Sequence, residues 1–162
     1  ISAVTKPKFI MKSSLIWAPV LGQYALRIGC VPVERGRRSE AIKFMMEQVQ
    51  LGTAPAGQLI IYPQGTRVAP GDNVPYKVGT AILYQITGQA CIPAATNVGI
   101  FWPKYGVYRS KGHAIVEFMP AIEQGLNKED FMYVLEKTIE TRSNELMQEA
   151  GFNGIHKDFR RI

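Results

Sequence analysis

Residues 59–71 read LIIYPQGTRVAPG, an apolar run that breaks off at a proline and then exposes a glycine, a threonine and an arginine. A short apolar run bounded by turn residues predicts a buried β-strand, which we expect over 58–62. Gly65 and Thr66 offer backbone N–H groups and a hydroxyl, and Arg67 offers a guanidinium group that can bind phosphate through two hydrogen bonds. The stretch therefore predicts a strand whose carboxyl end carries an anion-binding turn.

Strand and helix patterns alternate along the rest of the chain. Further strands are expected over 8–11, 30–33, 90–96 and 113–118, and helices over 14–27, 39–52, 77–87 and from Asn127 onward. The strands are short and almost uniformly apolar, which is typical of sheets covered on both faces. The pattern predicts an α/β fold with a mostly parallel or mixed central sheet flanked by helices, and residues 1–162 are expected to form a single domain.

A second strand end carries the same kind of side chain. Val33 closes a predicted strand and is followed closely by Arg35. In open α/β sheets ligands gather at the carboxyl ends of strands. We therefore expect Arg35 to bind a phosphomonoester together with the 64–67 turn, with added charge from Lys12 and Lys77. The alternative for any one of these cations is an ordinary solvated surface residue.

Charge and composition narrow the class of partner. The 162 residues include 19 Lys and Arg against 13 Asp and Glu, a net charge of +6. This balance favours an acidic partner such as a phosphorylated substrate, anionic lipid or nucleic acid. The apolar runs are too short to span a bilayer and no signal-peptide pattern heads the chain, so a soluble or peripheral segment is expected.

Other common kinds of site find no support in the sequence. The only cysteines, Cys30 and Cys91, lie far apart in apolar stretches, so no metal site or disulfide framework is expected. Phosphate-loop and dinucleotide-binding glycine patterns are absent, and so is the serine nucleophile elbow. We expect no cofactor.

Residues 101–111, FWPKYGVYRSK, combine aromatic and cationic side chains. Such a mixture suits a membrane interface, where aromatic rings and Lys or Arg meet lipid headgroups. The alternative is a long loop whose aromatic side chains cover a sheet edge. No nucleic-acid-binding motif accompanies the segment, so a nucleic-acid partner is not expected.

Taken in order, these features resemble the glycerolipid acyltransferase family, and within it the bacterial lysophosphatidic acid acyltransferases. The Gly-x-x-Phe/Pro-Ile/Val-x-Arg block of the family is similar to residues 29–35, and its Phe-Pro-Glu-Gly-Thr-Arg block to residues 62–67. Its Tyr/Phe-Lys-x-Gly block is similar to residues 76–79, and its Val-Pro-Val-Ala block to residues 92–95, with Asn97 shortly after. The resemblance implies a glycerol-3-phosphate acyltransferase-like fold.

The resemblance also implies a reaction. An acyl group passes from an acyl thioester, carried by coenzyme A or acyl carrier protein, to the free hydroxyl of lysophosphatidate, giving phosphatidate in phospholipid biosynthesis. The partners it implies are the lysophospholipid acceptor, the acyl donor and the cytoplasmic face of the inner membrane. The phosphate-binding residues it implies are Arg35, Gln64, Gly65, Thr66, Arg67 and Lys12, with Lys77 and Asn97 as secondary candidates.

The chain departs from the family pattern in ways that matter for catalysis. The family's His-x-x-x-x-Asp block carries the general base, but five residues after His113 and His156 stand Phe118 and Arg161. We therefore expect the catalytic His and Asp upstream of Ile1, an N-terminally incomplete domain, and no activity from these residues alone.

A second departure lies inside the turn. Gln64 replaces the family's glutamate, which keeps hydrogen bonding but removes a charge that could orient a neighbouring arginine. Similarly, Ser14 stands where the family's Lys-x-Glu-Leu block has glutamate, while Lys12 keeps the lysine. Two alternatives to lysophosphatidate acylation remain open: another lysolipid acceptor such as lyso-ornithine lipid, and a non-catalytic phosphate- or lipid-binding module that needs no base.

Overall fold

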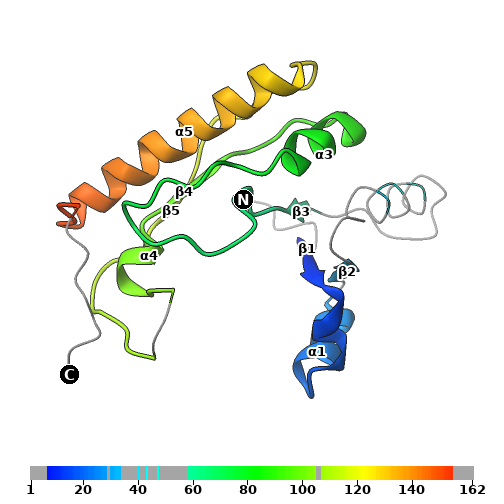
Figure 1. Ribbon diagram of the computed structural model, residues 1–162, viewed down its shortest axis with the longest axis horizontal. Coiled ribbons are helices and arrows are strands. Elements are labelled where there is room, and N and C mark those ends of the chain that lie inside the picture. Colours follow the sequence, from blue (N-terminus) through cyan, green and yellow to red (C-terminus); the bar gives the residue numbers. More distant parts are fainter. Residues whose placement is uncertain are drawn as a thin grey trace. The chain divides into compact units, whose positions relative to one another are not determined.

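The computed structural model describes residues 7–28, 30–33, 40, 43, 47, 58–104 and 107–154. Two compact units divide the chain, unit 1 over Ile1–Pro63 and unit 2 over Gln64–Ile162. Figure 1 labels the elements of each unit along the chain. Most of the helix predicted over 39–52 lies outside the described residues.

The sheet of unit 1 is parallel. Its central strand β1 (Pro7–Lys12) pairs with β2 (Val31–Val33) on one side and with β3 (Gln58–Ile60) on the other. The three strands predicted here are confirmed, although β3 ends two residues earlier than expected. Because all three strands run the same way, their carboxyl ends lie at the same edge of the sheet.

The helix predicted over 14–27 is wrong as a single element. A 3₁₀ helix, η1 (Ser13–Trp17), is followed by a separate α-helix, α1 (Leu21–Arg27). Pro19 stands between them. A proline inside a helix lacks the N–H that would bond to the preceding turn, and its ring collides with that turn. The chain therefore ends one helix and starts another.

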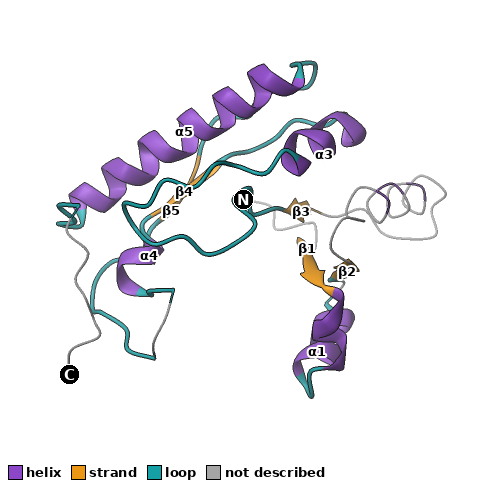
Figure 2. Cartoon of the chain, viewed as in Figure 1, coloured by secondary structure: helices purple, strands orange, loops and turns teal. Residues whose placement is uncertain are grey.

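The described residues of unit 2 form three helices and an antiparallel strand pair. Helices are purple and strands orange in Figure 2. The elements in order are α3 (Gly79–Thr87), β4 (Ala94–Thr96), α4 (Val98–Phe101), β5 (Val116–Phe118) and α5 (Lys128–Glu149). The two described sheets are parallel in unit 1 and antiparallel in unit 2. A single central sheet flanked by helices stays a prediction.

The core of unit 2 lies between α3 and α5. The rings of Tyr84 and Phe131 stack with their centroids 3.9 Å apart, and Leu135 is buried beside them. Helix α5 begins as predicted, because the Asn127 side chain accepts a hydrogen bond from the backbone N–H of Asp130 at 2.8 Å. The cap sets the start of α5, and the buried Phe131 and Leu135 follow it in the core cluster.

Strand β5 turns a charged residue toward α5. Arg142 of α5 donates from Nε and Nη2 to Glu117 Oε2 at 3.0 and 2.9 Å, and it also bonds to Glu145 and Glu149. The neighbours of Glu117 in the strand, Val116 and Phe118, are exposed. Exposure alternates along this strand, and the ion pair, rather than the apolar side chains, faces the helix.

Candidate functional site

The predicted anion-binding turn follows β3 and is open to solvent. The chain turns at Pro63 and Gln64, and Gly65 adopts a φ of 68°. This left-handed conformation is easy for glycine and costly for residues with a Cβ atom. Gly65, Thr66 and Arg67 are all exposed. Hence a hydroxyl, a guanidinium group and glycine backbone lie within three consecutive residues.

Gln64, the first residue of unit 2, is hydrogen-bonded through its side chain to α5. Gln64 Nε2 donates to Glu140 Oε1 at 3.4 Å, and the Tyr76 hydroxyl donates to the same oxygen at 2.8 Å. Tyr76 is only 8% exposed. Burial raises the pKa of Tyr76 well above its usual range, and the hydrogen bond to Glu140 and the charges of Glu140 and Glu136 raise it further. Tyr76 therefore acts as a neutral donor to a carboxylate.

Lys77 has the opposite environment from Tyr76, its neighbour in the chain. The lysine is exposed, and its backbone carbonyl accepts a hydrogen bond from the Thr80 N–H at 3.0 Å as α3 begins. The Tyr-Lys pair thus points one side chain into the unit and leaves the other available to an anionic ligand.

Asn97, a predicted secondary phosphate ligand, is 1% exposed. Its Nδ2 donates to the carbonyls of His113 and Leu146 at 3.3 and 3.4 Å, and its Oδ1 accepts from the Ile115 N–H at 2.8 Å. These bonds join the end of β4 to the segment before β5 and to α5. The side chain is committed to the scaffold, so we leave Asn97 out of the proposed phosphate site.

The remaining predicted ligands belong to unit 1. Lys12 is the last residue of β1 and pairs in register with Val33, the last residue of β2. Arg35 lies outside the described residues. The register places the ends of β1 and β2, at Lys12 and Val33, at the same edge of the sheet.

The described residues hold no obvious catalytic group of another kind. His113 is exposed, and His156 lies outside the described part of the chain. Both cysteines are free thiols, and burial raises the pKa of Cys91, which opposes thiolate formation. Within the described residues there is no group of three or more His, Cys, Asp or Glu side chains that could hold a metal ion. Nor does any described helix combine the length and apolarity needed to cross a membrane.

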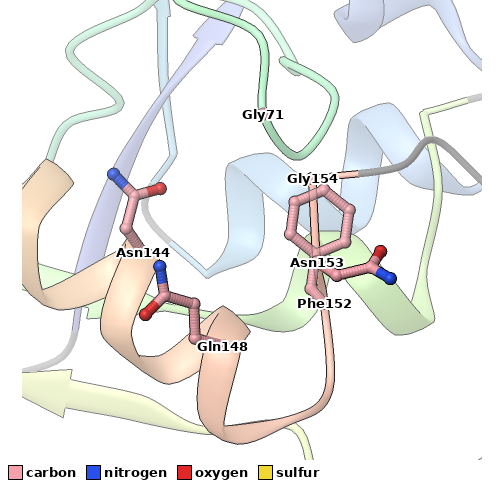
Figure 3. A pocket seen from close by; sticks show the side chains of 6 residues that line it. All are labelled: Gly71, Asn144, Gln148, Phe152, Asn153 and Gly154. Carbon is pink, nitrogen blue, oxygen red and sulfur yellow. The ribbon is translucent and has the colours of Figure 1, made fainter.

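A hollow on unit 2 is lined by Gly71 of the loop after the turn and by residues at the C-terminal end of α5 and just beyond it. Figure 3 shows Asn144 and Gln148 on α5 and the Phe152 ring beside the loop of Gly71; Asn153 and Gly154 complete the lining. None of these six lining residues is charged. The hollow therefore offers no group suited to neutralising a phosphate.

The family is decided by comparison with known proteins. The profile of the acyltransferase family matches residues 2–97, which include β1, the turn and β4. The chain belongs to this family.

Several named acyltransferases resemble the chain. It is 30% identical over 115 residues to a 1-acyl-sn-glycerol-3-phosphate acyltransferase of Limnanthes alba, covering 70% of the chain and 41% of the relative. The Pseudomonas aeruginosa enzyme of that name is 26% identical over 113 residues, covering 70% and 44%. The alpha enzyme of Mus musculus is 27% identical over 127 residues, covering 75% and 44%. The chain thus spans less than half the length of these curated relatives, and no solved structure matches it.

The acyltransferase profile ends before α5, and α5 supplies the residue that sequence reasoning missed. Glu140 is partly buried and lies on the same helical face as the buried Ser143 and Met147. The helical spacing of Glu140, Ser143 and Met147 was the sequence pattern that could have indicated that Glu140 faces the unit. In a helix rich in charged residues, however, a glutamate is ordinarily assigned to the solvent face.

Proposed function

We propose that this chain forms the acceptor-binding part of an enzyme that acylates lysophosphatidate to phosphatidate. The observation that carries the proposal is the turn after β3, which exposes Gly65, Thr66 and Arg67 in a member of the acyltransferase family. The names of the relatives support lysophosphatidate as the acceptor. The fold that goes with this function is a glycerol-3-phosphate acyltransferase-like sheet flanked by helices.

The proposed role of the turn is to hold the phosphate of the acceptor. Arg67 and Arg35 bind phosphate oxygens bidentately, and the backbone and hydroxyl of Gly65 and Thr66 add neutral donors. Lys12 and Lys77 contribute charge. Holding the phosphate places the free hydroxyl of the acceptor in line with the thioester, which lowers the barrier through positioning.

The chemical step is a direct transfer. The hydroxyl oxygen attacks the thioester carbonyl carbon, a C–O bond forms, the C–S bond breaks, and the thiol of coenzyme A or acyl carrier protein leaves. A general base must take the hydroxyl proton. Neither His113 nor His156 fits the family's His-x-x-x-x-Asp pattern, so the proposal gives them no part in this step.

We place this reaction at the cytoplasmic face of a membrane. Support comes from the segment after α4, where Trp102, Val107 and Tyr108 are exposed and the Arg109 guanidinium lies 4.2 Å from the Trp102 ring centroid. Aromatic rings beside cations suit lipid headgroups. The net charge of +6 favours both an anionic surface and an acidic acyl donor.

The function is tested by following phosphatidate formation from lysophosphatidate and an acyl thioester. The protein assayed joins this chain to a His-x-x-x-x-Asp block, and the acceptor is presented in neutral phosphatidylcholine vesicles. Arg67→Ala should lower kcat/KM about ten- to a hundredfold, because one charge-assisted contact to phosphate is lost. Arg27→Ala, which changes an exposed arginine at the end of α1, is the matched control.

Other outcomes would replace this function. Activity on lyso-ornithine lipid without activity on lysophosphatidate would change the acceptor. Binding of lysophosphatidate without turnover would leave a phosphate-binding module. Equal kcat/KM in Arg67→Ala and the unsubstituted protein would remove that arginine from the site, and equal turnover with detergent-dispersed acceptor in the absence of vesicles would count against the membrane surface.

A further inference from the structure

We propose that Glu140 is a positioning residue for the phosphate-binding turn, supplying from α5 the carboxylate that the family's Phe-Pro-Glu-Gly-Thr-Arg block carries inside the turn. The inference deepens the proposed function and rests on it. It assigns Glu140, which lies outside the residues that the family profile matches, a role in holding Arg67 and its neighbours in position.

The first argument is the meeting of three separate segments at one carboxylate oxygen. Glu140 Oε1 accepts from Gln64 at 3.4 Å and from Tyr76 at 2.8 Å. Gln64 immediately precedes Gly65, Thr66 and Arg67, and Tyr76 immediately precedes the exposed Lys77. One acceptor on a long helix thus binds the residue before Gly65 and the residue before Lys77.

The second argument is the chemistry of position 64. An amide can donate a hydrogen bond to a carboxylate, whereas a second carboxylate at the same place can only repel it unless one of the two binds a proton. Gln64 is therefore the residue that suits Glu140, and the family's glutamate would not suit it. The departure of this turn from the family pattern is explained by its partner on α5.

The third argument is the burial of the other donor. Tyr76 is 8% exposed, and its hydroxyl has Glu140 as its acceptor. A buried hydroxyl without an acceptor is unfavourable, so Tyr76 holds the carboxylate in place. Because Tyr76 occupies this oxygen from inside the unit, Glu140 presents a fixed acceptor to Gln64 rather than a freely rotating side chain.

The test is a double-mutant cycle that exchanges the two groups. Gln64→Glu, Glu140→Gln and the double variant are compared for binding of a short-chain lysophosphatidate by calorimetry and for denaturant unfolding. We expect each single substitution to weaken binding about tenfold and the double variant to return to within about twofold of the original affinity. The exchange returns one amide and one carboxylate to the pair, with the positions reversed.

Matched controls separate this effect from a general change of charge. Glu136→Gln removes a carboxylate one turn earlier on α5, which acts on Tyr76 through its charge. Gln85→Glu adds one at an exposed position of α3. Both controls should change affinity less than about twofold, since neither residue bonds to the turn.

Each outcome bears on a definite claim. Additive losses of affinity in the double variant would overturn the pairing. If the two substitutions had non-additive effects on the free energy of unfolding while both single variants kept their affinity, Glu140 would be a structural residue only. The monoacylglycerol that lacks the phosphate serves as the reference ligand. If the unsubstituted chain bound both ligands equally, the proposed function of the turn would fail and the positioning role with it, whatever the unfolding data showed.

Discussion

Two groups of residues in unit 2 have opposite environments. Gly65, Thr66 and Arg67 are exposed in the turn after β3, whereas Asn97 and Tyr76 are 1% and 8% exposed and bonded within the unit. All five lie within the residues that the acyltransferase profile matches. The matched region therefore contains both exposed groups and groups that hold the scaffold.

The two groups should respond differently to substitution. A buried polar group that loses its partner carries the full cost of desolvation, so its loss appears in the free energy of unfolding. An exposed side chain in a turn contributes little to stability, and its loss appears in ligand binding. Measuring the free energy of unfolding and the ligand affinity of the same variants tests whether the two groups differ in this way.

The largest stability effect is expected at Asn97. Asn97→Ala removes three hydrogen bonds to backbone groups, including the one that satisfies the Ile115 N–H. We expect the free energy of unfolding to fall by about 3 kcal/mol. Denaturant unfolding measures it, with Asn73→Ala in the exposed loop before α3 as the control. A loss no larger than that of the control would place Asn97 with the exposed group.

Local sequence was enough to predict the exposed turn of Gly65, Thr66 and Arg67 and the secondary-structure elements around it. The apolar runs of β1, β2 and β3 and the start of the last helix at Asn127 depend on neighbouring residues, and each is confirmed. The turn itself was predicted from the turn residues that end the apolar run, and Gly65 there has a φ of 68°. Such features can be predicted because the residues that cause them are neighbours in the sequence.

The buried half depends on partners far away in the chain. Gln64 and Glu140 are 76 residues apart, and Asn97 and Leu146 are 49 apart. No pattern within a helix or strand indicates that such residues will meet. Asn97 was accordingly predicted as a phosphate ligand rather than as a buried residue that holds the scaffold. The contact between Glu117 and Arg142 was not predicted.

A second prediction concerns Tyr76 and alkaline pH. Burial and Glu140 raise the pKa of Tyr76 in the folded protein, whereas a tyrosine in the unfolded chain ionises near about pH 10. The folded state keeps a proton that the unfolded state loses, so this contribution is complete below that pH and is lost as the pH rises further. The slope attributable to Tyr76 should approach about 1.4 kcal/mol per pH unit.

The free energy of unfolding is measured from about pH 9 to about pH 11, and the slope due to Tyr76 is the difference between the slopes of two variants. Tyr76→Phe should remove the slope, since phenylalanine has no proton to retain. Tyr133→Phe, at a tyrosine that is 65% exposed on α5, should keep it. Identical alkaline slopes for the two variants would show that Tyr76 ionises as an exposed tyrosine does.

The smallest expected effect compares two glycines of neighbouring blocks. Gly65 has a φ of 68°, so Gly65→Ala should destabilise the protein by about 1 kcal/mol through backbone strain. Gly79 opens α3, and an added Cβ there meets nothing within 4 Å. Gly79→Ala should therefore stabilise by about 0.5 kcal/mol, because alanine is the better helix former. Denaturant unfolding should show shifts of opposite sign. If both alanines stabilised the protein, the turn would have no need of its left-handed glycine, and the conformation that presents Thr66 and Arg67 would have to arise from Gln64 and its bond to Glu140 instead.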